Sequence, residues 1–97
     1  MPAYVIATIE VTDPEAYEAY KTAAAAAIAK HGGRYLARGG RSHVAEGAFP
    51  GSRFVLLEFA DYATAQGFVA SADYQAAKAL RAGAAEMNMV IIEGYVP

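Results

Sequence analysis

The chain has 97 residues and a formal net charge of −2, from 8 basic and 10 acidic residues. This length predicts one domain over residues 1–97, and the charge argues against a nucleic-acid binder that neutralises phosphates. There is no cysteine, which excludes disulfide scaffolds, thiolate nucleophiles and cysteine-based zinc sites.

The first predicted strand covers residues 3–11, AYVIATIEV, in which strand-forming residue types dominate. Its odd positions are all apolar, whereas its even positions mix apolar, hydroxyl and charged side chains. A strand shows alternate residues to opposite faces, so the odd face is expected to pack against helices. The even face is expected to meet a cavity, a partner or solvent.

A helix is predicted to start after Asp13 and to run to about His31. Asp13 suits the N-cap, Pro14 suits the first helical position, and Gly32 suits the position just past the end. Tyr17 falls at helical spacing with other apolar residues on one stripe. That stripe is expected to face the sheet.

Two further strands are predicted at Arg34–Arg38 and Arg53–Phe59. The pair Gly39-Gly40 suggests a bulge or bend after the first of them, with the strand resuming over residues 41–46. Residues 47–51 contain two glycines and a proline, which predicts a turn into the next strand.

The remainder of the chain predicts a second helical region and a last strand. The helical region has two pieces, at about residues 62–69 and 73–85, with Asp61 and Ser71 as caps. The last strand is expected over residues 89–95.

The resulting order, β-α-β-β-α-β, predicts an α+β fold of the ferredoxin-like type. Its four-stranded antiparallel sheet carries both helical regions on one face and leaves the other face bare. Soluble monomers rarely expose a large apolar face, and much of the 56% apolar content is alanine, which makes a thin core. We therefore expect a homodimer that pairs through the bare faces.

Several segments resemble one bacterial family. They are Tyr4 to Ala7 (YVIA), Glu10 to Glu15 (EVTDPE), Tyr17, Tyr20, His31 to Gly40 (HGGRYLARGG), Glu46-Gly47, Leu57 to Phe59 (LEF), and Ser71 to Gln75 (SADYQ) with Lys78 and Arg81. Together they resemble the uncharacterised family called domain of unknown function 1330. The resemblance implies a dimeric α+β barrel, in which two sheets close around a shared interior, and no settled activity. Related barrel families include cofactor-free monooxygenases, haem enzymes and ligand-binding regulators.

Arg38 and Glu58 are the first candidate site residues. Both are charged positions within predicted hairpin strands, where a buried charge is costly unless it is paired. Simple alternation puts both on the barrel-facing side with Leu36 and Leu56. They are expected to bond each other or to converge on one ligand; the alternative is a structural ion pair or a solvated strand end.

The two histidines, His31 and His43, are candidate general bases because imidazole titrates near neutrality. His31 equally suits a capping role at a helix end, and His43 a surface position. Tyr17 is a candidate ligand-binding residue among seven tyrosines, with packing as the alternative. The histidine spacing gives no metal signature, so neither a metal nor a cofactor is expected.

These observations favour a protein that binds a small molecule in the barrel interior through Arg38, Glu58, His43 and Tyr17. The alternative is a cofactor-free monooxygenase-like or isomerase-like enzyme, with His43 or Glu58 as the catalytic group. A protein with no pocket near these residues would instead be a structural partner. No apolar run approaches the roughly 18–20 residues of a membrane span, and no signal-peptide pattern precedes the first strand. A cytoplasmic location is therefore expected, with no nucleic-acid or membrane partner.

Overall fold

The computed structural model describes all residues from 1 to 97. It has four strands and three helices: β1 (Ala3–Val11), α1 (Pro14–Lys30), β2 (Arg34–Arg38), β3 (Arg53–Phe59), α2 (Tyr62–Ala70), α3 (Ala72–Leu80) and β4 (Ala85–Glu93).

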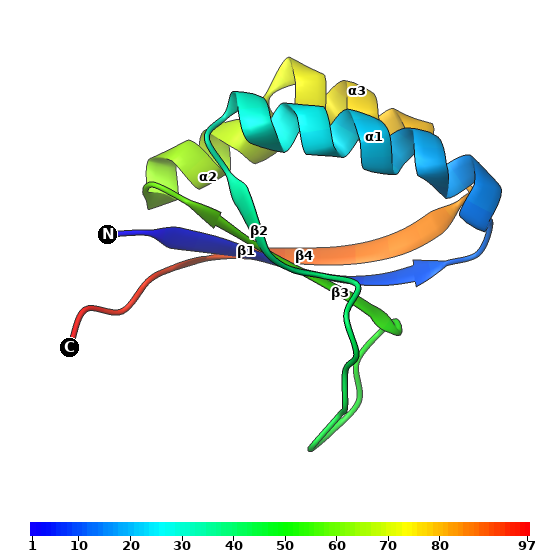
Figure 1. Cartoon of the computed structure of the whole chain (residues 1–97), viewed down its shortest axis with the longest axis horizontal. Helices are drawn as coiled ribbons and strands as arrows, with labels where there is room; N and C mark the ends of the chain where they lie inside the picture. Colours follow the sequence, from blue (N-terminus) through cyan, green and yellow to red (C-terminus); the bar gives the residue numbers. More distant parts are fainter.

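The strands form one antiparallel sheet in the order β2-β3-β1-β4. All three helices lie on the same side of this sheet, and the other side is uncovered (Figure 1). The predicted ferredoxin-like fold is therefore confirmed, with the second helical region divided into α2 and α3.

The core lies between the sheet and the helices. On β1 the odd positions Ala3, Val5, Ala7 and Ile9 are at most 4% exposed, as the alternating pattern predicted. From α1 the buried side chains are Tyr17, Tyr20, Ala24, Ala27 and Ile28.

The predicted helix boundaries are confirmed where a capping residue marks them. The Asp13 carboxylate accepts a hydrogen bond from the Ala16 amide at 3.2 Å, and Gly32 follows α1 with a φ of 75°. Ser71 both ends α2 and caps α3, where its hydroxyl accepts from the Tyr74 amide at 3.2 Å. These local signals determine the ends because they satisfy backbone groups that the helix leaves free.

The bulge in β2 lies at Leu36, whereas at Gly39-Gly40 the chain makes the predicted bend rather than a bulge, with a φ of 65° at Gly39. Tyr35 pairs with Leu57 and Ala37 with Leu56, so the register shifts by one residue between them. One extra residue reverses the side on which every later side chain of the strand lies. This shift decides where Arg38 points.

Residues 41–46 do not resume the strand as predicted. They form part of an irregular arm, residues 39–52, which projects away from the sheet on the side opposite the helices (Figure 1). Gly39 still donates to the Phe54 carbonyl at 2.9 Å, but no strand pairing continues past it.

The end of α3 and the start of β4 also differ from the prediction. The helix ends at Leu80 because Gly83, with a φ of 78°, makes the turn into the sheet. β4 then pairs with the full length of β1, from Ala85 opposite Val11 to Glu93 opposite Ala3.

The uncovered face of the sheet carries exposed apolar side chains. Ile6 is 38% exposed, Val90 54% and Ile92 51%, and register places Leu56 beside Ile6 on this face. None of the helices combines the length and the apolar character needed to cross a membrane.

Candidate functional site

A cavity lies within the protomer, between the helix-covered face of the sheet and helices α1 to α3. Its volume is about 40 Å³, which is room for a few water molecules. It is lined by Val5, Ala7, Ile9, Tyr17, Tyr20, Lys21, Ala24, Ile28, Tyr35, Arg38, Arg53, Val55, Leu57, Phe68, Tyr74, Met87 and Met89. The sequence had instead suggested a site between the sheets of two protomers.

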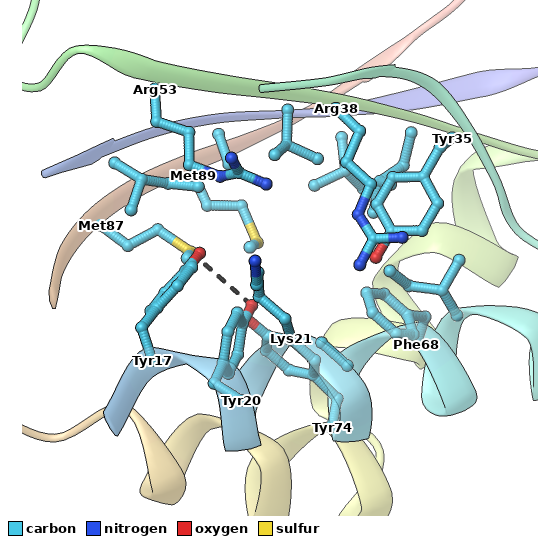
Figure 2. Close-up of a pocket in the computed structure, with 17 residues that line it drawn as sticks. Tyr17, Tyr20, Lys21, Tyr35, Arg38, Arg53, Phe68, Tyr74, Met87 and Met89 are labelled. Atoms are coloured by element: carbon cyan, nitrogen blue, oxygen red, sulfur yellow. Dashed lines mark hydrogen bonds between the residues drawn. The ribbon is translucent and has the colours of Figure 1, made fainter. Parts of the chain in front are cut away.

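Three cationic side chains line the mostly apolar cavity. Lys21 comes from α1, Arg38 from the end of β2 and Arg53 from the start of β3. Figure 2 shows their charged ends directed from three sides toward the same space. The Arg38 guanidinium also lies over the Tyr35 ring, 4.4 Å from its centroid, a favourable cation–π contact.

Arg53 is held in an unusual setting. No protein group accepts a hydrogen bond from its buried Nε, and Arg53 takes part in no ion pair. Its guanidinium packs directly on the backbone of Gly39, where a Cβ would overlap Nη1. Gly39 also has a φ of 65°, which favours glycine, and a Cβ at this position would displace the end of the Arg53 side chain.

Four tyrosines supply the other polar groups of the cavity. The hydroxyls of Tyr20 and Tyr74 lie 3.2 Å apart, and Arg81 Nη1 donates to the Tyr74 hydroxyl at 3.3 Å. Burial raises the pKa of Tyr17, Tyr20 and Tyr35, and nearby arginines only partly oppose this. These phenols are therefore neutral donors and acceptors near pH 7, so they leave the positive charge of the cations uncompensated.

Glu58 does not line this cavity, and the predicted pairing of Arg38 with Glu58 was wrong. Arg38 lies opposite Val55 on the helix-covered face, whereas Glu58 lies opposite Arg34 on the bare face. Arg34 Nη2 and Glu58 Oε1 form an ion pair at 2.7 Å. The bulge at Leu36 separates the two expected partners, because it moves Arg38 to the other face.

His43 is also distant from the cavity lining. It lies on the exposed arm, where a wide open groove of about 450 Å³ is lined by Ser42, His43, Val44, Ala45, Glu46, Phe49 and Phe54. The rings of Phe49 and Phe54 meet edge to face at 5.7 Å. Of the four predicted site residues, the structure therefore brings only Tyr17 and Arg38 together.

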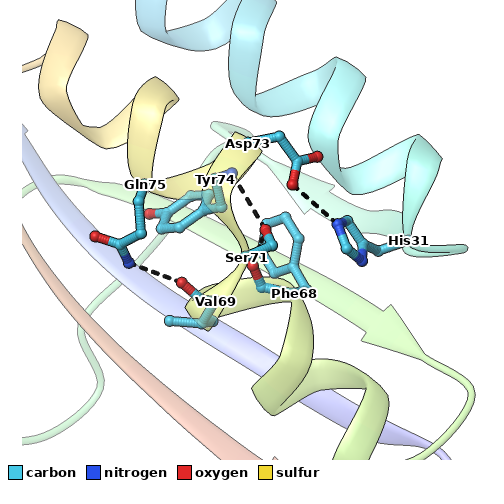
Figure 3. Close-up of polar contacts among 7 residues, drawn as sticks. All are labelled: His31, Phe68, Val69, Ser71, Asp73, Tyr74 and Gln75. Atoms are coloured by element: carbon cyan, nitrogen blue, oxygen red, sulfur yellow. Dashed lines mark hydrogen bonds and ion pairs between the residues drawn. The ribbon is translucent and has the colours of Figure 1, made fainter.

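His31 joins two helices and does not face the cavity. Its Nε2 lies 3.1 Å from Asp73 Oδ1, which links the C-terminal end of α1 to the first turn of α3 (Figure 3). The Ser71 hydroxyl and then His31 lower the pKa of Asp73 to about 2. The contact suits a structural tie, because a carboxylate is favoured at a helix N-terminus and a protonated imidazole at a C-terminus.

Sequence reasoning missed Arg53 and Lys21 as site residues. Arg53, Val55 and Leu57 are alternate residues of β3, and the latter two face the helices. Alternation along the strand could therefore have predicted that Arg53 faces the helices too. Lys21 follows Tyr17 by four residues, at the edge of the helical stripe. No cluster of three or more histidine, aspartate or glutamate side chains that could hold a metal is present in the chain.

The family model described as "Domain of unknown function (DUF1330)" matches residues 2–95. The chain belongs to this family. No curated protein is significantly similar to the chain in sequence.

Solved structures share the fold of this DUF1330 protein at low sequence identity. A protein of unknown function from Rhodopseudomonas palustris is 16% identical, with a TM-score of 0.75 over 99% of this chain and 84% of its own. SnoaB, a cofactor-independent oxygenase from Streptomyces nogalater, is 11% identical, with a TM-score of 0.69 over 99% and 95%. A dimeric protein of unknown function with a ferredoxin-like fold from Bacteroides fragilis is 17% identical, with a TM-score of 0.59 over 96% of each chain.

Proposed function

We propose that this protein binds a small organic molecule in the cavity between the sheet and the helices. The observation that carries the proposal is an apolar cavity surrounded by a few converging polar groups, the usual composition of a ligand site. Tyr17 and Arg38 keep their proposed binding roles. Arg53, Lys21 and the pair Tyr20–Tyr74 join them.

Binding is favoured over acid–base catalysis by the residues that line the cavity. No histidine, aspartate or glutamate is among them, and the tyrosine pKa values are raised. A general base works best with a pKa near the operating pH. Glu58 and His43, the proposed catalytic candidates, lie outside this lining.

An NMR titration tests the proposed function. Propionamide and benzamide are neutral probes, one with a short alkyl group and one with a ring. Either should shift the amide resonances of cavity-lining residues such as Val5, Ala24 and Leu57, in a saturable manner. Shifts confined to the arm groove around His43 would instead assign binding to that groove and would overturn the proposal.

We also propose that two copies pair through the bare sheet face. Ile6, Leu56, Val90 and Ile92 form an apolar surface there, and proteins of similar fold are described as dimeric. Burial of such a surface is favourable at about 25 cal/mol per Å². The arm of residues 39–52 projects on the same side (Figure 1), where a second copy would contact it.

A second candidate function is cofactor-free oxygenation of an electron-rich substrate. The likeness to SnoaB favours it, and the cavity offers apolar walls with phenol and cationic hydrogen-bond donors. Because no histidine, aspartate or glutamate lines the cavity, the substrate itself must be acidic enough to lose its proton without a general base. Oxygen consumption with hydroquinone-type substrates tests the idea, and a rate equal to that of the buffer alone would exclude this candidate for those substrates.

A further inference from the structure

We infer that the ligand is a small organic anion whose charged group binds Arg53 at the cavity mouth, with Gly39 as the residue that positions Arg53. This inference rests on the proposed function and specifies its substrate class. The ligand has an apolar end that enters the cavity and a carboxylate, or an acidic group of similar charge, at the mouth.

Positive charge around the cavity is not balanced by negative charge. Lys21, Arg38 and Arg53 line it together, and no carboxylate lines it. Neither arginine takes part in an ion pair, and Lys21 pairs only with Glu18, whose side chain is 65% exposed, on the same helix. Three cations beside apolar walls, with one exposed carboxylate as their only ion-pair partner, favour the binding of an anion.

Arg53 has an unsatisfied hydrogen-bond donor. Its buried Nε has no acceptor in the chain, and a buried donor without a partner is destabilising. A carboxylate can accept from Nε and a neighbouring guanidinium nitrogen at once, in the two-bond geometry that arginine favours. An anionic ligand would therefore satisfy a group that the folded chain leaves free.

The backbone of Gly39 restricts the position of Arg53. Its guanidinium packs on Gly39, where a Cβ would overlap Nη1. The amide of Gly39 is fixed by its 2.9 Å hydrogen bond to the Phe54 carbonyl, next to Arg53 in β3. The backbone just past β2 thus limits where the guanidinium can lie, and a cation restricted in position binds an anion with less loss of entropy than a mobile one.

The size of the cavity limits the ligand. A volume of about 40 Å³ admits only a fragment of a molecule, comparable to a few water molecules. The rest of the ligand must lie at the mouth, where Arg38 is exposed. A short acyl chain or the edge of one ring fits the enclosed part.

The test compares each acid with its neutral amide. Propionate is measured against propionamide, and benzoate against benzamide, by NMR titration at low and at physiological salt. Charge-assisted hydrogen bonds predict that at least one acid binds about tenfold to hundredfold more tightly than its amide. Inorganic phosphate, which has the charge without the apolar end, should bind more weakly than that acid.

Matched variants assign the effect to Arg53. Arg53→Met should lower the acid-to-amide ratio at least severalfold while amide binding persists, and Arg53→Lys should retain more of the preference. Arg41→Met removes the same charge from the exposed arm, and its ratio should equal that of wild type. Persistent amide binding by Arg53→Met also reports that this variant is folded.

Gly39→Ala tests the positioning role. It should reduce the acid preference severalfold, whereas Gly47→Ala should not. Gly47 has a similar φ of 76° but nothing within 4 Å of an added Cβ, so it controls for backbone strain. An equal acid preference in the two variants would overturn the role of Gly39.

The outcomes separate the inference from the proposed function. Equal binding of acids and amides to wild type, or an acid preference that Arg53→Met leaves undiminished, overturns the inference and leaves the cavity as a binding site. Failure of all four compounds to shift cavity resonances overturns both.

Discussion

The replacement Ala7→Val should stabilise the ligand-free protein and weaken ligand binding. Ala7 is 4% exposed, lines the cavity and lies between Val55 and Met89, which line it too. Valine adds two methyl groups directed into the empty space. It also has a higher strand propensity than alanine.

The magnitude follows from the volume of the cavity. Empty space in a core costs about 24 cal/mol per Å³, so filling the 40 Å³ cavity is worth at most about 1 kcal/mol. In a domain of this size, that free energy raises the melting temperature by roughly 4–8 °C. The same methyl groups occupy the place of the ligand's apolar end, so benzamide binding should fall at least tenfold.

Ala3→Val is the matched control. Ala3 is on the same strand and the same face, and it is fully buried, but it does not line the cavity. Valine there should overpack the core against Phe59, its neighbour on β3, and destabilise the protein by about 1–3 kcal/mol.

Urea denaturation at one fixed protein concentration measures the free energy of unfolding of both variants. Their midpoints can be compared only if their m-values are equal. If Ala7→Val lowers stability as much as Ala3→Val, the space beside Ala7 cannot accept two methyl groups. The volume argument for a ligand site would then be refuted.

Two further predictions concern assembly and pH. Leu56→Asp should yield a folded monomer of half the native mass by light scattering, because Leu56 lies on the bare face. Leu57 is 4% exposed and faces the helices, so Leu57→Asp should unfold the protomer. A wild-type protein that is monomeric by light scattering would contradict the proposed pairing. Asp73→Asn should lower stability at pH 7 through loss of the contact with His31. Because the pKa of Asp73 is lowered to about 2 from 3.8, its charge contributes stability above about pH 4, and this contribution is lost as pH falls through 2. The urea midpoints of wild type and Asp73→Asn, measured across pH 2–7, should therefore approach each other as the pH falls toward 2. A difference in midpoint that stays constant with pH would contradict the prediction.

The sequence by itself determined the elements and their order. Alternation in β1 identified the helix-facing side chains correctly, because a strand that buries one face must repeat with period two. Asp13 and Ser71 marked helix ends because capping is a local interaction between a side chain and nearby amides. The βαββαβ order was then sufficient for the sheet topology.

The tertiary structure alone decided which charges meet. The extra residue at Leu36 depends on how β2 pairs with β3, and nothing in RYLAR marks it locally. It places Arg38 beside Arg53 under the helices and leaves Glu58 to Arg34 on the other face. Side-chain direction along a strand reverses with each single-residue shift in register. A pattern read from sequence therefore predicts a site in a strand only as far as the first bulge.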